Sequence, residues 1–148
     1  MATAPVAYTI GYEGWELDEF VARLREQRVE VLIDIREKPA SRKPGFSKTP
    51  LRAALEDAGI EYVHVNALGS PSAIRYEYKN GGDKDSFFRA YRAYAKTQIA
   101  PLQSVLDTVR EKTCCLMCLE RHAWGCHRSA VSDMLKELDG NGLRIAHL

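Results

Sequence analysis

Short apolar runs rich in β-branched residues alternate along the chain with longer segments in which apolar residues recur at helical spacing. The short runs indicate five strands, over Val6–Ile10, Val29–Ile35, Ile60–Val65, Thr113–Leu119 and Leu143–His147. The run of Val, Leu and Ile in the second is typical of a strand covered on both faces, so this strand is expected to lie centrally. The alternation of strands and helices predicts repeated β-α units and a mainly parallel sheet.

Helical periodicity lies between most of these runs. Helices are predicted around Leu17–Leu24, from Thr49 to Gly59, and over Asp85–Thr97, Pro101–Arg110 and Cys126–Leu138. The segment Asn66–Asp83 holds several glycines and a proline and is predicted to be a long irregular loop, functional or mobile. The expected fold is a three-layer α/β fold, with a mainly parallel five-stranded sheet and helices on both faces.

Length and charge narrow the class of protein. A chain of 148 residues can be served by one hydrophobic core, so residues 1–148 are expected to form a single α/β domain. Hydrophobic residues make up 45% and charged residues 28%, which excludes a disordered or fibrous chain. The formal charge of +1 gives no strong overall field toward DNA or an anionic membrane, so any anion binding must be local.

The sequence also indicates a compartment. The first residues lack a basic stretch followed by a long apolar one, and no segment has the apolar length of a membrane span. Among the four cysteines, Cys114, Cys115 and Cys118 crowd one apolar run, and a chain of this size folds without disulfides. We therefore expect a cytoplasmic protein with free thiols and no membrane association.

Candidate site residues, most of them polar, gather where three of the predicted strands end. They are Gly11, Tyr12, Glu13, Asp34, Arg36, Glu120, Cys126, His127 and Arg128. In open parallel sheets, ligands bind in the crevice at the carboxyl ends of the strands. We therefore expect these residues to surround one cavity, with Tyr12 lining it.

Cys126 stands at the start of a predicted helix, where exposed N–H groups and the helix dipole favour a thiolate. Arg128 and a protonated His127 would favour it further, so Cys126 is a candidate nucleophile. The alternative is a small thiol that caps the turn while Arg128 forms a surface ion pair. A phosphatase-type loop is excluded, because it requires arginine six positions after the cysteine and Ser132 stands there.

No metal site is predicted. Cys115 and Cys118 have the closest ligand spacing, but they point to opposite faces of a strand and cannot hold one ion together.

Carboxylates are the other candidates for catalysis. Glu120 and Asp34 end strands that are expected to be neighbours, so they can face each other across a crevice and divide the acid and base roles. Glu13 is a third candidate carboxylate at this crevice. Alternatively, Asp34 binds loop amides or pairs with Arg36 or Arg42 and holds the site together.

The loop after the second strand is dense in positive charge. The guanidinium of Arg42 can donate two hydrogen bonds to one anion, and Lys43 adds a localised positive charge, so both suit phosphate or a nucleic-acid backbone. The ring of Phe46 can stack on a base. Ser47 is a further candidate contact. The alternative is a solvated loop with Phe46 folded onto the core. The segment Arg75–Lys79 can extend the basic patch or form a lid.

Several short motifs occur together: Thr9–Gly14, Asp34–Arg36, Ser41–Lys48, Tyr62–His64, Leu68-Gly69, Cys118–Glu120 and Cys126–Arg128. In this combination the chain resembles the domain-of-unknown-function family 488 over nearly its whole length. The resemblance implies an α/β fold and a shared site, and it supplies no established reaction.

Two functions are compatible with these residues. The first is a small hydrolase or transferase acting on a phosphorylated, nucleotide-like or nucleic-acid substrate, with Cys126 or Glu120 doing the chemistry and Arg36, Arg42, Lys43 and Arg128 holding the anion. The second is a module that binds or senses a nucleotide or nucleic acid without turnover. The sequence identifies no cofactor.

Overall fold

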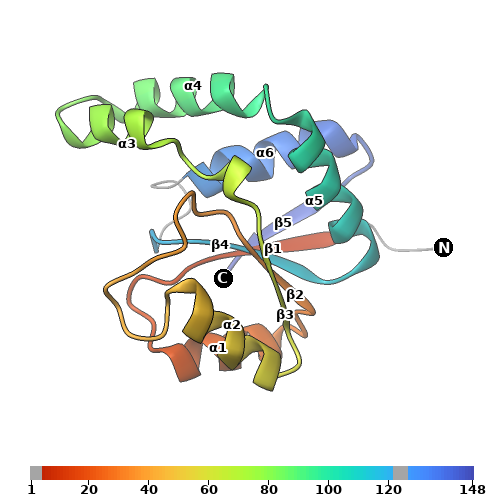
Figure 1. The fold of residues 1–148 in the computed structure, drawn as a ribbon. Coiled ribbons are helices and arrows are strands. Elements are labelled where there is room, and N and C mark those ends of the chain that lie inside the picture. Colours follow the sequence, from red (N-terminus) through yellow and green to blue (C-terminus); the bar gives the residue numbers. More distant parts are fainter. Residues whose placement is uncertain (1–4, 122–126) are drawn as a thin grey trace.

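A computed structural model describes residues 5–121 and 127–148. Within these residues the chain forms one sheet of five parallel strands, in the order β3-β2-β4-β1-β5 (Figure 1). The strands are β1 (Val6–Gly11), β2 (Val31–Asp34), β3 (Glu61–His64), β4 (Cys114–Cys118) and β5 (Arg144–His147). This confirms the predicted α/β fold, and the sheet is wholly parallel.

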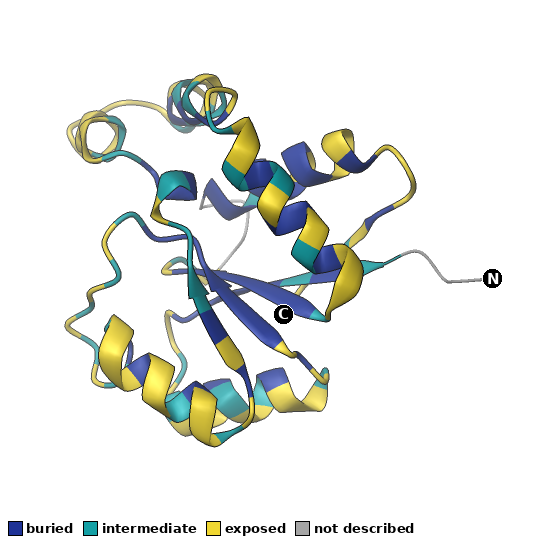
Figure 2. Ribbon diagram, turned by 45° about the vertical axis from the view of Figure 1, so that its right-hand side comes forward, coloured by how far each residue is buried: buried dark blue, intermediate teal, exposed yellow. Residues whose placement is uncertain are grey.

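Helices cover both faces of the sheet (Figure 1). One face is covered by α1 (Leu17–Glu26) and α2 (Lys48–Asp57), and the other by α5 (Ile99–Glu111) and α6 (His127–Asp139). Figure 2 shows that each of these helices turns its buried side to the sheet and its exposed side to solvent. The three predicted layers are therefore present.

Successive side chains of β4 point to opposite faces of the sheet, so they belong to two separate parts of the hydrophobic core. Cys114, Leu116 and Cys118 belong to the core cluster on the α5/α6 side, whereas Cys115 and Met117 belong to the cluster on the α1/α2 side. All five are buried, as expected for a strand in the interior of a sheet that is covered on both faces.

The strand order places the site. β4 lies between β2 and β1, so the strands that end in Asp34 and near Glu120 are neighbours, as predicted. The chain leaves β1 and β2 toward the α1/α2 face, and it leaves β4 toward the α6 face. A crevice opens at the carboxyl ends of strands whose connections diverge in this way.

The prediction of an irregular loop over Asn66–Asp83 is wrong. This segment holds a 3₁₀ turn, η1 (Asn66–Leu68), and an eight-residue helix, α3 (Ser72–Lys79), which packs against α4 (Lys84–Ala95). No residue of α3 is buried, and Pro71 before it and Gly81 and Gly82 after it favour a loop in the sequence. In Figure 1, α3 and α4 lie farther from the sheet than α6 does.

The cysteines depart from expectation at one position. Cys114 and Cys115 are free, and burial raises the pKa of both thiols. Cys118 is disulfide-bonded, so the expectation of free thiols is wrong there. None of the helices in the described parts of the chain has the length and apolar character needed to cross a membrane.

Candidate functional site

A cavity of about 430 Å³ opens where β1, β2 and β4 end. Its lining, within the described residues, combines cations, carboxylates and rings. The cations are Arg36, Lys38, Arg75 and Lys79; the carboxylates are Glu37 and Glu120; the aromatic rings are Tyr12, Tyr78, Phe87 and His127. Ala40, Ser70, Cys118 and Leu119 complete it.

The ends of β1 and β4 stay paired beyond the sheet, and Gly11 makes this approach possible. The backbone N–H of Tyr12 donates to the carbonyl of Cys118 at 3.1 Å, and that of Glu13 to the carbonyl of Leu119 at 2.9 Å. A Cβ atom on Gly11 would lie 1.6 Å from the backbone oxygen of Glu120, so only glycine fits. This pairing sets Tyr12 and Glu120 into the same wall.

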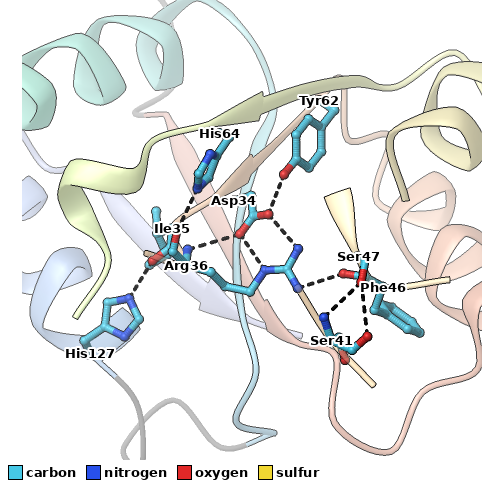
Figure 3. A network of polar contacts seen from close by, with 9 residues as sticks. All are labelled: Asp34, Ile35, Arg36, Ser41, Phe46, Ser47, Tyr62, His64 and His127. Carbon is cyan, nitrogen blue, oxygen red and sulfur yellow. Dashed lines mark hydrogen bonds and ion pairs between the residues drawn. The ribbon is translucent and has the colours of Figure 1, made fainter. Parts of the chain in front are cut away.

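Arg36 is held at the cavity by a buried ion pair with Asp34 (Figure 3). Its Nε donates to one oxygen of Asp34 at 2.9 Å and its Nη2 to the other at 2.8 Å. Nη1 donates to the carbonyl of Phe46 at 2.7 Å. The side chain of Asp34 is fully buried, and that of Arg36 is 7% exposed, so the pair is desolvated as well as bidentate.

Tyr62 and His64, from β3, complete this network (Figure 3). The Tyr62 hydroxyl donates to Asp34 at 2.5 Å, and Nε2 of His64 lies 2.7 Å from the carbonyl oxygen of Arg36. Burial raises the pKa of Tyr62, and its hydrogen bond to the Asp34 carboxylate raises it further. Burial opposes the charge of Arg36, yet the bonds to Asp34 outweigh it and the net pKa shift is upward. The guanidinium is therefore always charged.

Glu120 brings an ionisable carboxyl to the same cavity. It is partly buried, and burial raises the pKa of this carboxyl, with the nearby charge of Glu13 adding to the shift. Arg128 and Lys79 oppose it without cancelling it. A carboxyl whose pKa moves toward neutrality can both donate and accept a proton, which is the requirement for acid–base catalysis.

His127 lies at the first position of α6 and is buried. Its Nε2 lies 2.8 Å from the carbonyl oxygen of Ile35, which can only accept, so Nε2 carries the proton (Figure 3). Burial lowers the pKa of His127 to about 4, and the ring is neutral at physiological pH. The protonated His127 expected beside Cys126 is therefore not the form that this environment favours.

Acidification is expected to destabilise the protein through His127. The folded-state pKa of about 4 lies below the ordinary value of 6.5, so the unfolded chain binds the proton more tightly. The free energy of unfolding then falls as the pH drops from about 6.5 to about 4, by about 3 kcal/mol in total. Urea titrations across this range measure it, and His127→Gln should flatten the dependence. An unchanged slope in that variant would assign the acid sensitivity to another group.

The structure brings part of the predicted set together. Tyr12, Arg36, Glu120 and His127 line the cavity. Gly11 and Asp34 are buried directly behind it, the first at the contact of β1 and β4 and the second beneath Arg36.

Arg128 is 1% exposed, and its Nη2 donates to the carbonyl of Arg121 at 3.3 Å. Glu13 is exposed and accepts the N–H of Arg121 at 3.2 Å. Cys126 lies outside the described residues.

Four predicted site residues of the basic loop do not line the cavity: Arg42, Lys43, Phe46 and Ser47. Arg42 is exposed and Lys43 lies 3.8 Å from Glu16, and neither lines the cavity. Phe46 is fully buried and stacks on Tyr12, with ring centroids 4.8 Å apart. Ser47 bonds within the loop, to Ser41. Phe46 therefore supports the cavity wall from behind, which is the core position weighed as the alternative.

The chain was also compared with protein families, curated proteins and solved structures. A family model described as the domain of unknown function DUF488 matches residues 16–135. The chain belongs to this family. Searches of curated proteins and of solved structures found no match. The matched range covers Asp34, Arg36, Glu120 and His127, so most of the cavity is built from the part of the chain that defines DUF488.

Sequence reasoning missed some cavity residues of this DUF488 protein. Glu37 and Ser70 flank Arg36 and Gly69, but nothing in their spacing singles them out. Phe87 resembles an ordinary core residue of α4. Arg75 and Lys79 are expected from the sequence to extend the basic patch or to belong to a lid; their four-residue spacing becomes informative once Ser72–Lys79 is known to be a helix.

In the parts of the chain that the structure describes, no three His, Cys, Asp or Glu side chains are grouped so as to hold a metal ion.

Proposed function

We propose that this protein is a hydrolase or transferase that acts on a small phosphate-bearing, nucleotide-like substrate. One observation carries the proposal: a carboxyl with a raised pKa, Glu120, lies in the same cavity as Arg36, Lys38, Arg75 and Lys79. The cations suit an anionic substrate, and the carboxyl suits proton transfer at the reacting bond.

Arg36 is suited to orient the phosphate. Three of its five N–H donors are used by Asp34 and Phe46, and Tyr12 also interacts with the guanidinium, which leaves at most two donors for a ligand acceptor. Because Asp34 fixes the guanidinium in place, a ligand binds it without the entropy cost of ordering a free arginine.

The aromatic lining suits a base or another flat ring through Tyr78, which is 36% exposed. Tyr12 is stacked on Phe46 with an angle of 11° between the rings, and the Arg36 guanidinium lies 5.3 Å from the Tyr12 centroid, so Tyr12 supports the wall and is not itself free to stack. Tyr78 and Phe87 face each other with centroids 4.9 Å apart. Pockets that combine such rings with a few polar groups are typical of small-molecule sites, and rings of this kind stack on bases without a sequence preference.

Glu120 is the group to which we assign proton transfer. As an acid it protonates the leaving atom while the bond to the phosphate-bearing part breaks, and as a base it takes the proton of the attacking water or acceptor. The neutral His127 beside it adds no positive charge that would keep Glu120 ionised. Cys126 has no part in the proposal.

The anion requirement is tested by matched pairs of lysine and arginine variants. Lys38→Gln/Lys79→Gln removes two charges from the cavity lining, and Arg42→Gln/Lys43→Gln removes two from the loop outside it. We expect the first pair to weaken binding of nucleoside 5′-monophosphates by about three- to tenfold and the second to have less effect. Calorimetric titration at two salt concentrations measures both.

Equal losses in the two pairs would show a diffuse charge effect and would overturn the site. Absence of binding by the unaltered protein would overturn the proposed substrate class. If nucleoside monophosphates bind tightly but no phosphate ester is turned over, the protein is a binding module and not an enzyme.

A further inference from the structure

An internal carboxylate occupies the amino-terminal end of α3. Glu37, from the loop after β2, accepts the Ser72 hydroxyl at 2.6 Å, the Ser72 backbone N–H at 3.3 Å and Nη2 of Arg75 at 3.1 Å. A backbone N–H, a hydroxyl and a guanidinium converging on one anion are the donors of a phosphate site.

The position favours an anion for a second reason. The first N–H groups of a helix have no partner inside it and carry the positive end of its dipole. Pro71, which precedes α3, makes no side-chain cap bond. The anion that fills this end therefore comes from elsewhere in the chain, 35 residues away.

Ser70 supplies an independent observation. It is 3% exposed and lines the cavity, and its hydroxyl has no hydrogen-bond partner in the described chain. An unsatisfied buried hydroxyl is unfavourable, so such a group indicates a ligand that completes it. Ser70 and Glu37 belong to adjoining segments: a Cβ atom on Gly69 would lie 2.1 Å from the backbone nitrogen of Glu37.

We infer that Ser70 and Arg75, which line the cavity, together with Ser72, which lies beside it and binds Glu37, form a phosphate subsite, and that Glu37 is the internal anion that the substrate's phosphate displaces. This inference rests on the proposed function and adds to it a place for the phosphate and a built-in competitor. A phosphate monoester carries about two negative charges and more acceptor oxygens than a carboxylate, so it can take all of the donors that Glu37 uses and the Ser70 hydroxyl as well.

The inference differs from simple helix capping in what it predicts for binding. If Glu37 only caps α3, its loss lowers stability and leaves phosphate affinity unchanged. If it competes for the subsite, its loss strengthens phosphate binding.

Glu37→Gln tests this directly, because glutamine keeps the shape and one acceptor oxygen and removes the charge. We expect the variant to bind inorganic phosphate and adenosine 5′-monophosphate about three- to tenfold more tightly than the unaltered protein. The matched control is Glu56→Gln on α2, which also removes one negative charge and an ion pair, the 2.9 Å contact with Arg52. Its affinity should stay within about twofold.

Ser70→Ala gives a second readout that does not depend on the fate of Glu37. Because the Ser70 hydroxyl makes no hydrogen bond in the described chain, its removal should leave the thermal midpoint unchanged or higher. Phosphate affinity should fall about threefold or more, as expected for one lost hydrogen bond.

The outcomes separate the two proposals. If phosphate affinity is unchanged in Glu37→Gln, or rises equally in Glu56→Gln, Glu37 does not compete with phosphate for the subsite. Unchanged affinity in Ser70→Ala overturns the subsite. In each of these cases the proposed function stands if nucleoside monophosphates still bind and Lys38→Gln/Lys79→Gln still weakens their binding; the outcomes that overturn it are those given above for the lysine and arginine pairs and for turnover.

Discussion

Replacing Glu120 by glutamine is expected to lower kcat by about 10²–10⁴-fold, the range lost when a general acid or base is removed. The carboxyl lies in the same cavity as Arg36 and Lys79, and its raised pKa is caused first by burial. Glutamine keeps the size and polarity of the side chain but cannot exchange a proton. The measurement is kcat on the best substrate of a phosphate-ester panel, with KM expected to change little.

Stability gives the control for folding in this variant. A carboxyl whose pKa is raised in the folded state makes its stabilising contribution below its unfolded pKa and loses it as the pH rises through the folded value. Glu120→Gln carries no such proton, so at neutral pH it should be at least as stable as the unaltered protein. A large loss of kcat with an unchanged or higher thermal midpoint would identify a catalytic carboxyl.

Glu13→Gln is the comparison variant for Glu120→Gln, because it removes a neighbouring carboxylate. Glu13 is exposed, and its charge contributes to the raised pKa of Glu120. Removing that charge should move the corresponding inflection of the kcat profile to lower pH and leave the maximal rate within a few-fold. If Glu120→Gln keeps full activity, proton transfer belongs to another group.

The fold was predictable because the strands in the interior of its sheet are covered on both faces. The apolar run of β2 is a direct consequence of a covered parallel sheet, and it indicated an interior strand, as the position of β2 between β3 and β4 confirms. α3 was missed because it is short and because the proline before it and the glycines on either side of it indicate a loop. In the structure it packs against α4, and none of its residues is buried.

The residues of the candidate site also fall into a group that the sequence predicts and a group that it does not. Tyr12, Arg36 and Glu120 directly follow strands, and the carboxyl-end rule predicts that such residues converge. Arg42 and Lys43 lie in a loop whose direction depends on the burial of Phe46, and charge alone does not give that direction. Arg75 and Lys79 reach the cavity only because a helix unseen in the sequence carries them there.

Asp34→Ala is expected to lower the free energy of unfolding by about 3–5 kcal/mol, the cost of leaving a buried charge without its partner. Asp34 is fully buried and accepts Nε and Nη2 of Arg36 as well as the Tyr62 hydroxyl. Its removal leaves the Arg36 guanidinium, whose side chain is only 7% exposed, with a single described acceptor, the carbonyl of Phe46. Urea titration by circular dichroism measures the change.

The double variant Asp34→Leu/Arg36→Met separates the ion pair from its burial. Replacing both charges by apolar groups of similar volume removes the desolvation cost together with the attraction, so it should destabilise less than Asp34→Ala alone. If the double variant is the less stable of the two, the pair contributes net stability beyond compensation of the buried charge. A double variant that folds yet fails to bind nucleoside monophosphates would show what the pair is for. Asp34 then acts as the positioning residue that holds the Arg36 guanidinium at the cavity, and the fold tolerates the loss of both charges while the site does not.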